Sequence, residues 1–199
     1  MTRWRTFVAL GDSFTEGLDD PDGSGGFRGW ADLVATRLAG PGFRYANLAV
    51  RGKLLDQVVT EQVPAALEMA PGLISFAAGG NDILHNYRPD AIRATLDEVI
   101  GRLTGTGVQV VMFTAADVTT TLPRTLEPRI DSFNALIREV AAGHGATLVD
   151  LWPDDGFRNV RMWSEDRLHL SSQGHQRVAS LVLEALGAPY PESWRVDPP

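Results

Sequence analysis

Short apolar runs alternate along the chain with segments in which apolar residues recur every three or four positions. The runs cover residues 7–10, 43–48, 73–77, 108–113 and 147–151, and their length predicts five strands. Apolar stripes with helical spacing lie between or after these runs, and we expect one helix for each. The stripes are Trp30, Val34 and Leu38; Leu55, Val58 and Val59; Ile92, Leu96, Val99 and Leu103; Ile130, Phe133, Ile137 and Val140; and Val178, Leu181, Val182, Ala185 and Leu186.

Strands that alternate with helices predict an α/β fold with a parallel sheet covered on both faces. Right-handed crossovers leave few topologies, of which we favour the flavodoxin-like order 2-1-3-4-5. In such sheets ligands bind at the carboxyl ends of the strands, between the first and third. The 199 residues suit one domain, which we place at residues 1–188. The Pro-rich tail at 189–199 is expected to lie extended on the surface or to fray.

Three polar, Gly-rich loops follow the first three predicted strands and should meet at this edge. They are Gly11-Asp12-Ser13, Arg51-Gly52 and Gly79-Gly80-Asn81-Asp82. Each has an ordinary interpretation as turn chemistry. Together they also offer a nucleophile, Ser13, and three oxyanion donors: the backbone N–H groups of Ser13 and Gly52 and the side-chain amide of Asn81.

A serine nucleophile needs a base and a carboxylate that orients the base. His169 follows Asp166 by three positions, a spacing that lets one turn bring both side chains together. We therefore expect Asp166 to bind one imidazole nitrogen while the other faces Ser13. Glu165 is the rival carboxylate and ranks second, because its neighbouring position should point elsewhere.

These blocks, in this order, resemble the signature blocks of the SGNH hydrolases, also called GDSL-type esterases and lipases. The resemblance extends from about Arg5 to Leu186. It implies a three-layer α/β/α sandwich and hydrolysis of esters or thioesters, with Ser13, His169 and Asp166 as catalytic triad and Ser13, Gly52 and Asn81 as oxyanion hole. The chain departs from the common pattern in having Arg167 where a Gly usually follows the Asp, and a bulky Arg51 beside Gly52.

Composition narrows the other possibilities. The formal charge of −7 without a Lys/Arg cluster argues against nucleic acid as a partner, and the longest apolar runs are too short for a membrane span. The sequence has no cysteine, no G-x-G-x-x-G and no Walker A pattern, so we expect neither a nucleotide cofactor nor a metal. The N-terminal apolar run is too short for a signal peptide, so the expected location is cytoplasmic. The oligomeric state is left open.

Several weaker signals also have plain structural interpretations. Asp19, Asp20 and Asp22 fail the EF-hand spacing because Ala31 stands at the twelfth position, so we interpret them as a solvated loop near the site. His85 is expected on the surface, Trp163 is a candidate wall of the acyl pocket, and residues 119–123 should border that pocket.

The predicted function is hydrolysis of a small-molecule carboxylic ester. A thioesterase or a carbohydrate O-deacetylase on the same triad is the alternative within enzymes, and a non-catalytic binding module is the alternative outside them. Neither the acyl chain nor the alcohol of the substrate follows from the sequence.

Overall fold

The computed structural model describes residues 3–118 and 123–196. Within this part of the chain, five parallel strands form one sheet in the order β2-β1-β3-β4-β5. The strands are β1 (Thr6–Gly11), β2 (Arg44–Asn47), β3 (Leu73–Ala77), β4 (Gln109–Phe113) and β5 (Thr147–Val149). The α/β fold class and the predicted order 2-1-3-4-5 are thereby confirmed, and the observed strands differ from the predicted runs only at their ends.

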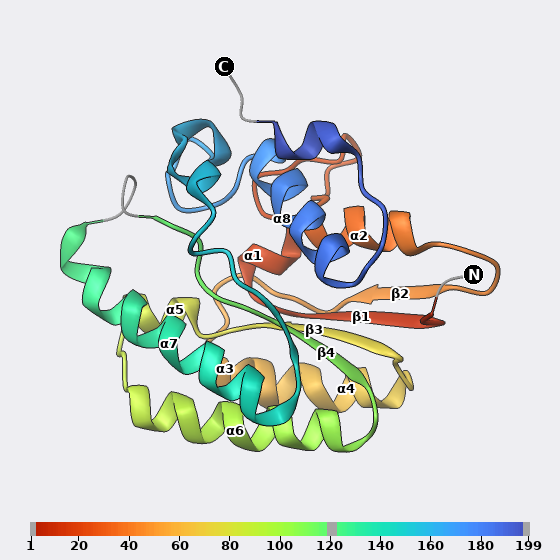
Figure 1. The fold of residues 1–199 in the computed structure, drawn as a ribbon, viewed down its shortest axis with the longest axis horizontal. Helices are drawn as coiled ribbons and strands as arrows, with labels where there is room; N and C mark the ends of the chain where they lie inside the picture. Colours follow the sequence, from red (N-terminus) through yellow and green to blue (C-terminus); the bar gives the residue numbers. More distant parts are fainter. Residues whose placement is uncertain (1–2, 119–122, 197–199) are drawn as a thin grey trace.

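Helices cover both faces of the sheet and make a three-layer sandwich (Figure 1). One face carries α1 (Ser13–Glu16), α2 (Trp30–Leu38) and α8 (Ser172–Ala185). The other carries α3 (Leu55–Gln57), α4 (Val63–Glu68), α5 (Gly80–Leu84), α6 (Pro89–Gly105) and α7 (Glu127–His144). The short 3-10 helices are η2 (Arg124–Leu126), η3 (Asp155–Arg158), η4 (Val160–Met162) and η5 (Glu192–Arg195).

The apolar stripes predicted from the sequence form most of the core. The β1 strand is buried along its whole length, as expected for a central strand covered on both sides. In α6 and α7 the residues of the predicted stripes face the sheet and are buried. The stripe of α8 is rotated from the prediction, because Val178, Ala179, Val182 and Leu183 are buried whereas Leu181 is only partly covered.

One turn of π-helix, η1 (Val58–Gln62), joins α3 to α4. Pro64 follows it at once, and proline has no N–H with which to continue an α-helical ladder. The wider turn aims the buried Gln62 side chain at the end of β1. Its amide accepts from Gly11 N at 2.8 Å and donates to Gly11 O at 2.9 Å. The backbone immediately before Asp12 and Ser13 is thereby fixed.

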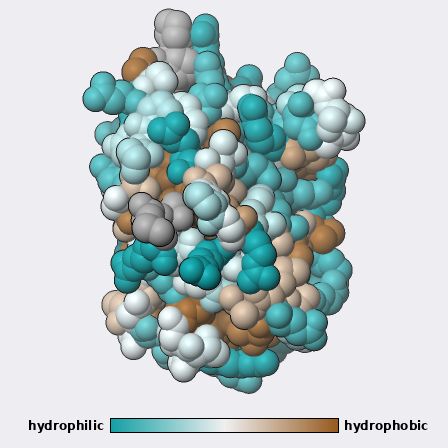
Figure 2. Space-filling view, turned by 90° about the vertical axis from the view of Figure 1, so that its right-hand side faces the viewer, coloured by the Kyte–Doolittle hydropathy of each residue, from teal (hydrophilic) through white to brown (hydrophobic). Residues whose placement is uncertain are grey.

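The amino ends of the strands lie at the end of the molecule away from Ser13. Hydrophilic side chains cover much of this face, and hydrophobic ones lie between them in smaller groups (Figure 2). Across the described residues, no helix combines the length and the apolar character that a membrane crossing requires.

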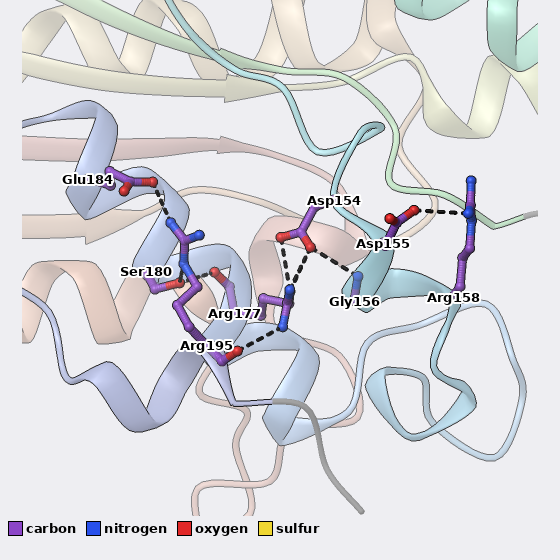
Figure 3. Close-up of polar contacts among 8 residues, drawn as sticks. All are labelled: Asp154, Asp155, Gly156, Arg158, Arg177, Ser180, Glu184 and Arg195. Atoms are coloured by element: carbon purple, nitrogen blue, oxygen red, sulfur yellow. Dashed lines mark hydrogen bonds and ion pairs between the residues drawn. The ribbon is translucent and has the colours of Figure 1, made fainter.

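The C-terminal segment is docked rather than extended, which corrects the expectation for part of residues 189–199. Arg195, in η5, donates to Ser180 Oγ at 2.6 Å and pairs with Glu184 on α8. The Arg195 carbonyl accepts from Arg177, which also holds Asp154 through Nε at 2.9 Å and Nη2 at 2.6 Å (Figure 3). The proposed domain limit at residue 188 stays a prediction.

This cluster ties the loop before η3 to α8. The Arg177 side chain is 10% exposed and that of Asp154 13%, so the pair is largely shielded from water. Gly156 lies so close that a Cβ there would fall 2.0 Å from Arg177 Cζ. The loop that begins here continues through η4 to Asp166 and His169, so the cluster anchors the segment that carries both.

We expect Arg177→Leu to lower the free energy of unfolding by about 3 kcal/mol, because it leaves the shielded Asp154 carboxylate without its guanidinium. Urea titration measures the change. Arg93→Leu is the matched control, since Arg93 and its partner Glu139 are exposed on the surface, and it should leave the urea midpoint unchanged. Equal losses in the two variants would contradict the anchoring role of Arg177.

Candidate active site

Ser13 lies where β1 ends, at the carboxyl edge of the sheet. Since β2 and β3 flank β1 on opposite sides, this is the point where the order of strands reverses. The chain turns directly from β1 into α1 (Figure 1). Asp12 caps this helix by accepting from Phe14 N at 3.1 Å. The main chain around Ser13 is therefore held by the β1 ladder, by Gln62 and by the cap.

A turn at residues 164–169 brings Asp166 and His169 together. Asp166 Oδ1 accepts from the backbone N–H groups of Leu168 at 2.9 Å and His169 at 3.0 Å. Asp166 Oδ2 lies 2.5 Å from His169 Nδ1, and His169 Nε2 lies 3.1 Å from Ser13 Oγ. Ser13, Asp166 and His169, predicted from opposite ends of the chain, thus form a continuous series of contacts. Among the described residues, Asp166 and Asp19 have carboxylate oxygens within 4 Å of the His169 imidazole, whereas the rival Glu165 does not.

Arg167 takes a left-handed backbone conformation in this turn, with φ of 62°. Glycine, the residue that the resembled family commonly has here, adopts this conformation without steric cost. Arg167 adopts the same conformation at a steric cost that glycine would not have, and the contact between Asp166 and His169 still forms. Arg167 Nη1 donates to Val160 O at 2.9 Å, which directs its charge away from His169 and toward η4.

The loop with Gly52 lies between the end of β1 and the Asn81 side chain. Val50 N donates to Gly11 O at 3.2 Å, and Asn81 Nδ2 donates to Lys53 O at 3.0 Å. Gly52 has φ of 76°, in the region that favours glycine. The Asn81 amide also donates to Asp12 Oδ2, at 3.3 Å. The three predicted oxyanion donors are consequently carried by one hydrogen-bonded group of loops.

Arg51 does not extend toward the cavity. Its guanidinium binds Glu16 through Nε at 3.0 Å and Nη2 at 2.6 Å, and it stacks 4.9 Å from the ring centre of Phe27. Its backbone N–H also donates to Glu16, at 2.9 Å. Arg51 therefore fastens the Gly52 loop to α1.

A cavity of about 190 Å³ opens beside Ser13, Asn81 and His169. Its walls are mostly apolar or aromatic, and Trp163 is one of them, as the sequence suggested. The apolar walls include Phe14, Ile83, Phe113, Ala116, Ile130, Phe133, Leu151 and Trp163. Residues 119–122, expected to border the pocket, lie outside the described residues.

Comparison with known proteins shows which family the chain belongs to. Residues 9–177 match the GDSL-like lipase/acylhydrolase family, which is most of the chain. The chain belongs to this family. The resemblance noted in the sequence and the prediction of a GDSL-type esterase are confirmed at that level.

Individual relatives are more distant. YpmR of Bacillus subtilis is 31% identical over 94 residues, which are 45% of this chain and only 36% of YpmR. The crystal structure of TesA is 26% identical and aligns with a TM-score of 0.74 over 91% of this chain and 97% of TesA. A catalytic mutant of Axe2, an acetylxylan esterase from Geobacillus stearothermophilus, is 17% identical, with a TM-score of 0.80 over 98% of this chain and 97% of Axe2. Because Axe2 is only 17% identical, the similarity to it shows a shared fold alone.

The structure gives contacts in the site to residues for which the sequence predicted none. Gln62 carries no signal in the sequence, since only the π turn aims it at Gly11. The segment with Asp19, Asp20 and Asp22 is not simply a solvated loop. Asp20 is 1% exposed and lies 2.5 Å from Ser172 Oγ at the start of α8, and Asp19 lies beside His169.

One group of possible metal ligands occurs among the described residues. Asp19, Asp166 and His169 bring ligand-type atoms within 4.8 Å of one another. However, Asp166 Oδ2 and His169 Nδ1 are 2.5 Å apart, which is too close for two separate ligands around one ion with bonds of about 2.0–2.2 Å. Direct contact between these two side chains fits the geometry better.

Burial and hydrogen bonds shift the pKa values of three ionisable groups in or next to the cavity. Burial raises the pKa of Asp12 to about 6, against the opposing effects of the Phe14 N–H and nearby His169. Burial also lowers the pKa of His175 to about 4, so this cavity-lining imidazole is neutral at pH 7. Partial burial works against the charge of Asp166, but hydrogen bonds from His169, Leu168 and Ser164 outweigh it and hold the pKa of Asp166 below its usual range.

The raised pKa of Asp12 predicts a dependence of stability on pH. Below pH 4 the carboxyl is neutral in both folded and unfolded protein, whereas above pH 6 the folded protein holds a buried charge. Asp12→Asn, which keeps the helix cap, should therefore gain roughly 1–3 kcal/mol relative to the parent protein between pH 4 and pH 8. Urea unfolding of both proteins at these two pH values measures it. A difference that stays constant with pH would contradict the shift.

Proposed function

We propose that this protein hydrolyses carboxylic esters through a covalent acyl-enzyme. The observation that carries the proposal is the series of contacts from Ser13 Oγ to His169 Nε2 at 3.1 Å and from His169 Nδ1 to Asp166 Oδ2 at 2.5 Å. Membership of the GDSL-like lipase/acylhydrolase family supports ester hydrolysis as the reaction.

In the first half of the reaction, Ser13 Oγ attacks the ester carbonyl carbon while His169 Nε2 takes the hydroxyl proton. Asp166 orients the ring and stabilises the imidazolium that forms. The carbonyl oxygen becomes an oxyanion, which the N–H groups of Ser13 and Gly52 and the Asn81 amide stabilise. His169 then donates the proton to the departing alkoxide, and the acyl group stays on Ser13.

In the second half, His169 takes a proton from water, and the hydroxide that forms attacks the acyl carbon. The same donors stabilise the second oxyanion, and His169 returns the proton to Ser13 as the acid leaves. Asn81 must free one amide hydrogen for these steps. The longer of its two bonds, to Asp12 at 3.3 Å, is the one that an oxyanion displaces more readily than the 3.0 Å bond to Lys53.

The role of Ser13 has a direct test. Ser13→Ala should lower kcat/KM on a p-nitrophenyl ester at least 1000-fold, since it removes the atom that attacks. A fluorophosphonate should add stoichiometrically to the parent protein, on a peptide containing Ser13, and should leave the variant unmodified. Intact-mass and peptide mass spectrometry measure both.

Ser24→Ala, at an exposed serine in a loop, is the control and should keep full activity and labelling. Folded parent protein that does not react with the fluorophosphonate would favour the binding module over the enzyme. Activity on an acyl thioester or an acetylated sugar well above that on an aryl ester would favour the thioesterase or the O-deacetylase.

The apolar cavity supports an acyl group longer than acetyl. An apolar cavity of about 150 Å³ is large enough to bind benzene, so a cavity of about 190 Å³ accommodates roughly six heavy atoms or slightly more. Burial of each methylene contributes about 0.8 kcal/mol, so kcat/KM should rise roughly 4-fold per carbon in a site that binds the chain fully. The proposed substrates are therefore esters of short to medium acyl chains.

We expect kcat/KM on p-nitrophenyl esters to rise from acetate to about hexanoate and to fall for dodecanoate, which exceeds the cavity. Ala116→Leu places three further carbons at the wall and should abolish the preference for hexanoate while leaving the acetate rate within a few fold. The acetate rate of the same variant controls for misfolding. An unchanged chain-length profile in Ala116→Leu would exclude this cavity as the acyl site.

A further inference from the structure

A second carboxylate stands next to the Asp166–His169 pair. Asp19 Oδ2 lies 3.9 Å from His169 Nδ1, the nitrogen that also faces Asp166. Ser164 links the two carboxylates, because its Oγ lies 2.7 Å from Asp19 Oδ2 and 2.7 Å from Asp166 Oδ1. The Nδ1 side of the imidazole therefore faces two acids rather than one.

The hydroxyl of Ser164 has one proton and so donates to one carboxylate at a time. Both contacts have the usual length of an O–H···O hydrogen bond. Asp166 Oδ1 thus receives its third contact from Ser164, in addition to the N–H groups of Leu168 and His169. While Ser164 donates to Asp166, three groups hold Oδ1, and Oδ2 is directed at the imidazole.

The backbone holds Asp19 in place from both sides. Asp19 has φ of 71°, a left-handed conformation that is uncommon outside glycine and is tolerated best by Asn and Asp. On one side Gly17 packs so tightly on Gly29 that a Cβ at Gly17 would lie 2.3 Å from Gly29 N. On the other, the buried Asp20 is fastened to Ser172 at 2.5 Å. A costly conformation retained beside an active site points to a role there.

We propose that Asp19 is a positioning residue for the reaction: it holds Asp166 through Ser164, and its charge stabilises the imidazolium that His169 becomes. This role rests on the proposed function of Ser13 and His169. The other ionisable groups close to His169 are Asp12 and Asp166, which are acidic, and the neutral His175. Asp19 is itself close to the guanidinium of Arg51, which Glu16 already binds.

The test compares kcat/KM between pH 5 and pH 9 on a p-nitrophenyl ester. In the parent protein, activity should fall on the acid side of the profile, because the base must be neutral. Asp19→Asn should lower the plateau at high pH about 3- to 10-fold. It should also move the midpoint of the acid side to lower pH by about half a unit, because a negative charge near the imidazolium is removed.

Ser164→Ala separates the two effects, because it breaks the link but keeps both charges. It should lower the plateau about as much as Asp19→Asn and leave the midpoint in place. If Asp19 acts on Asp166 through Ser164, the double variant should have a plateau no lower than the poorer single variant. Plateau losses that multiply, or a midpoint that Asp19→Asn does not move, would overturn the proposal.

Two further variants distinguish a role of Asp19 in the reaction from a role in surface charge or in folding. Glu165→Gln removes one exposed charge next to Asp166 in sequence and should change neither plateau nor midpoint. Asp19→Gly relieves the left-handed conformation, so it should fold at least as well as the parent and still show the losses of Asp19→Asn. Full activity in a folded Asp19→Gly would show that Asp19 has no role in the reaction.

The same measurements separate the role of Asp19 from that of Ser13. If Ser13→Ala abolishes activity while the Asp19 variants behave as the parent, the triad stands and Asp19 has no part in it. If Ser13→Ala stays active, both proposals fall together.

Discussion

The parallel pairing of β1 with β2 and β3 is the constraint on which the site depends. Because all three strands run in the same direction, the loops that follow them leave at one edge of the sheet and meet there. The β1 strand is hydrogen-bonded on both sides and buried along its length, so the backbone that leads into Ser13 is held firmly by the core. His169 arrives from 156 positions further along the chain and has no such strand beneath it. Its placement depends instead on the Arg177–Asp154 pair, the turn around Asp166 and the start of α8.

The sequence contained enough information to predict the strands, their order and the contacts among Ser13, Asp166 and His169. Strand order followed from two sources: the alternating periodicity, which is visible in short windows of sequence, and the handedness of crossovers, which is a rule for parallel sheets. The Asp166–His169 contact followed from a spacing of three, which a single turn can satisfy. These predictions succeeded because each depends on residues close together in the chain, on a rule that holds for the whole fold class or, for Ser13 and His169, on the base that a serine nucleophile requires. The catalytic roles of these residues stay predictions until they are tested.

Other parts of the site depend on contacts between segments that are distant in the sequence, and no local pattern predicts them. Gln62 reaches Gly11 only because a π turn precedes Pro64. Asp19 and Ser164 are 145 positions apart, and the sequence around each is typical of an ordinary loop. The prolines near the C-terminus predicted an extended tail, but the decisive residue there is Arg195, whose partners lie on α8. Long-range polar contacts of this kind become visible only when the fold is known.

The π turn also limits how the length of the chain can vary. Insertions into most surface loops leave a sheet and its neighbours undisturbed. Residues 58–62 are different, because a π-helical turn holds about one residue more than an α-helical turn. Deletion of a single residue between 58 and 61 would restore ordinary α-helical winding and rotate Gln62 by about 100° relative to α3, the helix that precedes it. The amide would then swing away from Gly11. Homologous chains that lack this extra residue must therefore secure the end of the first strand by some other side chain.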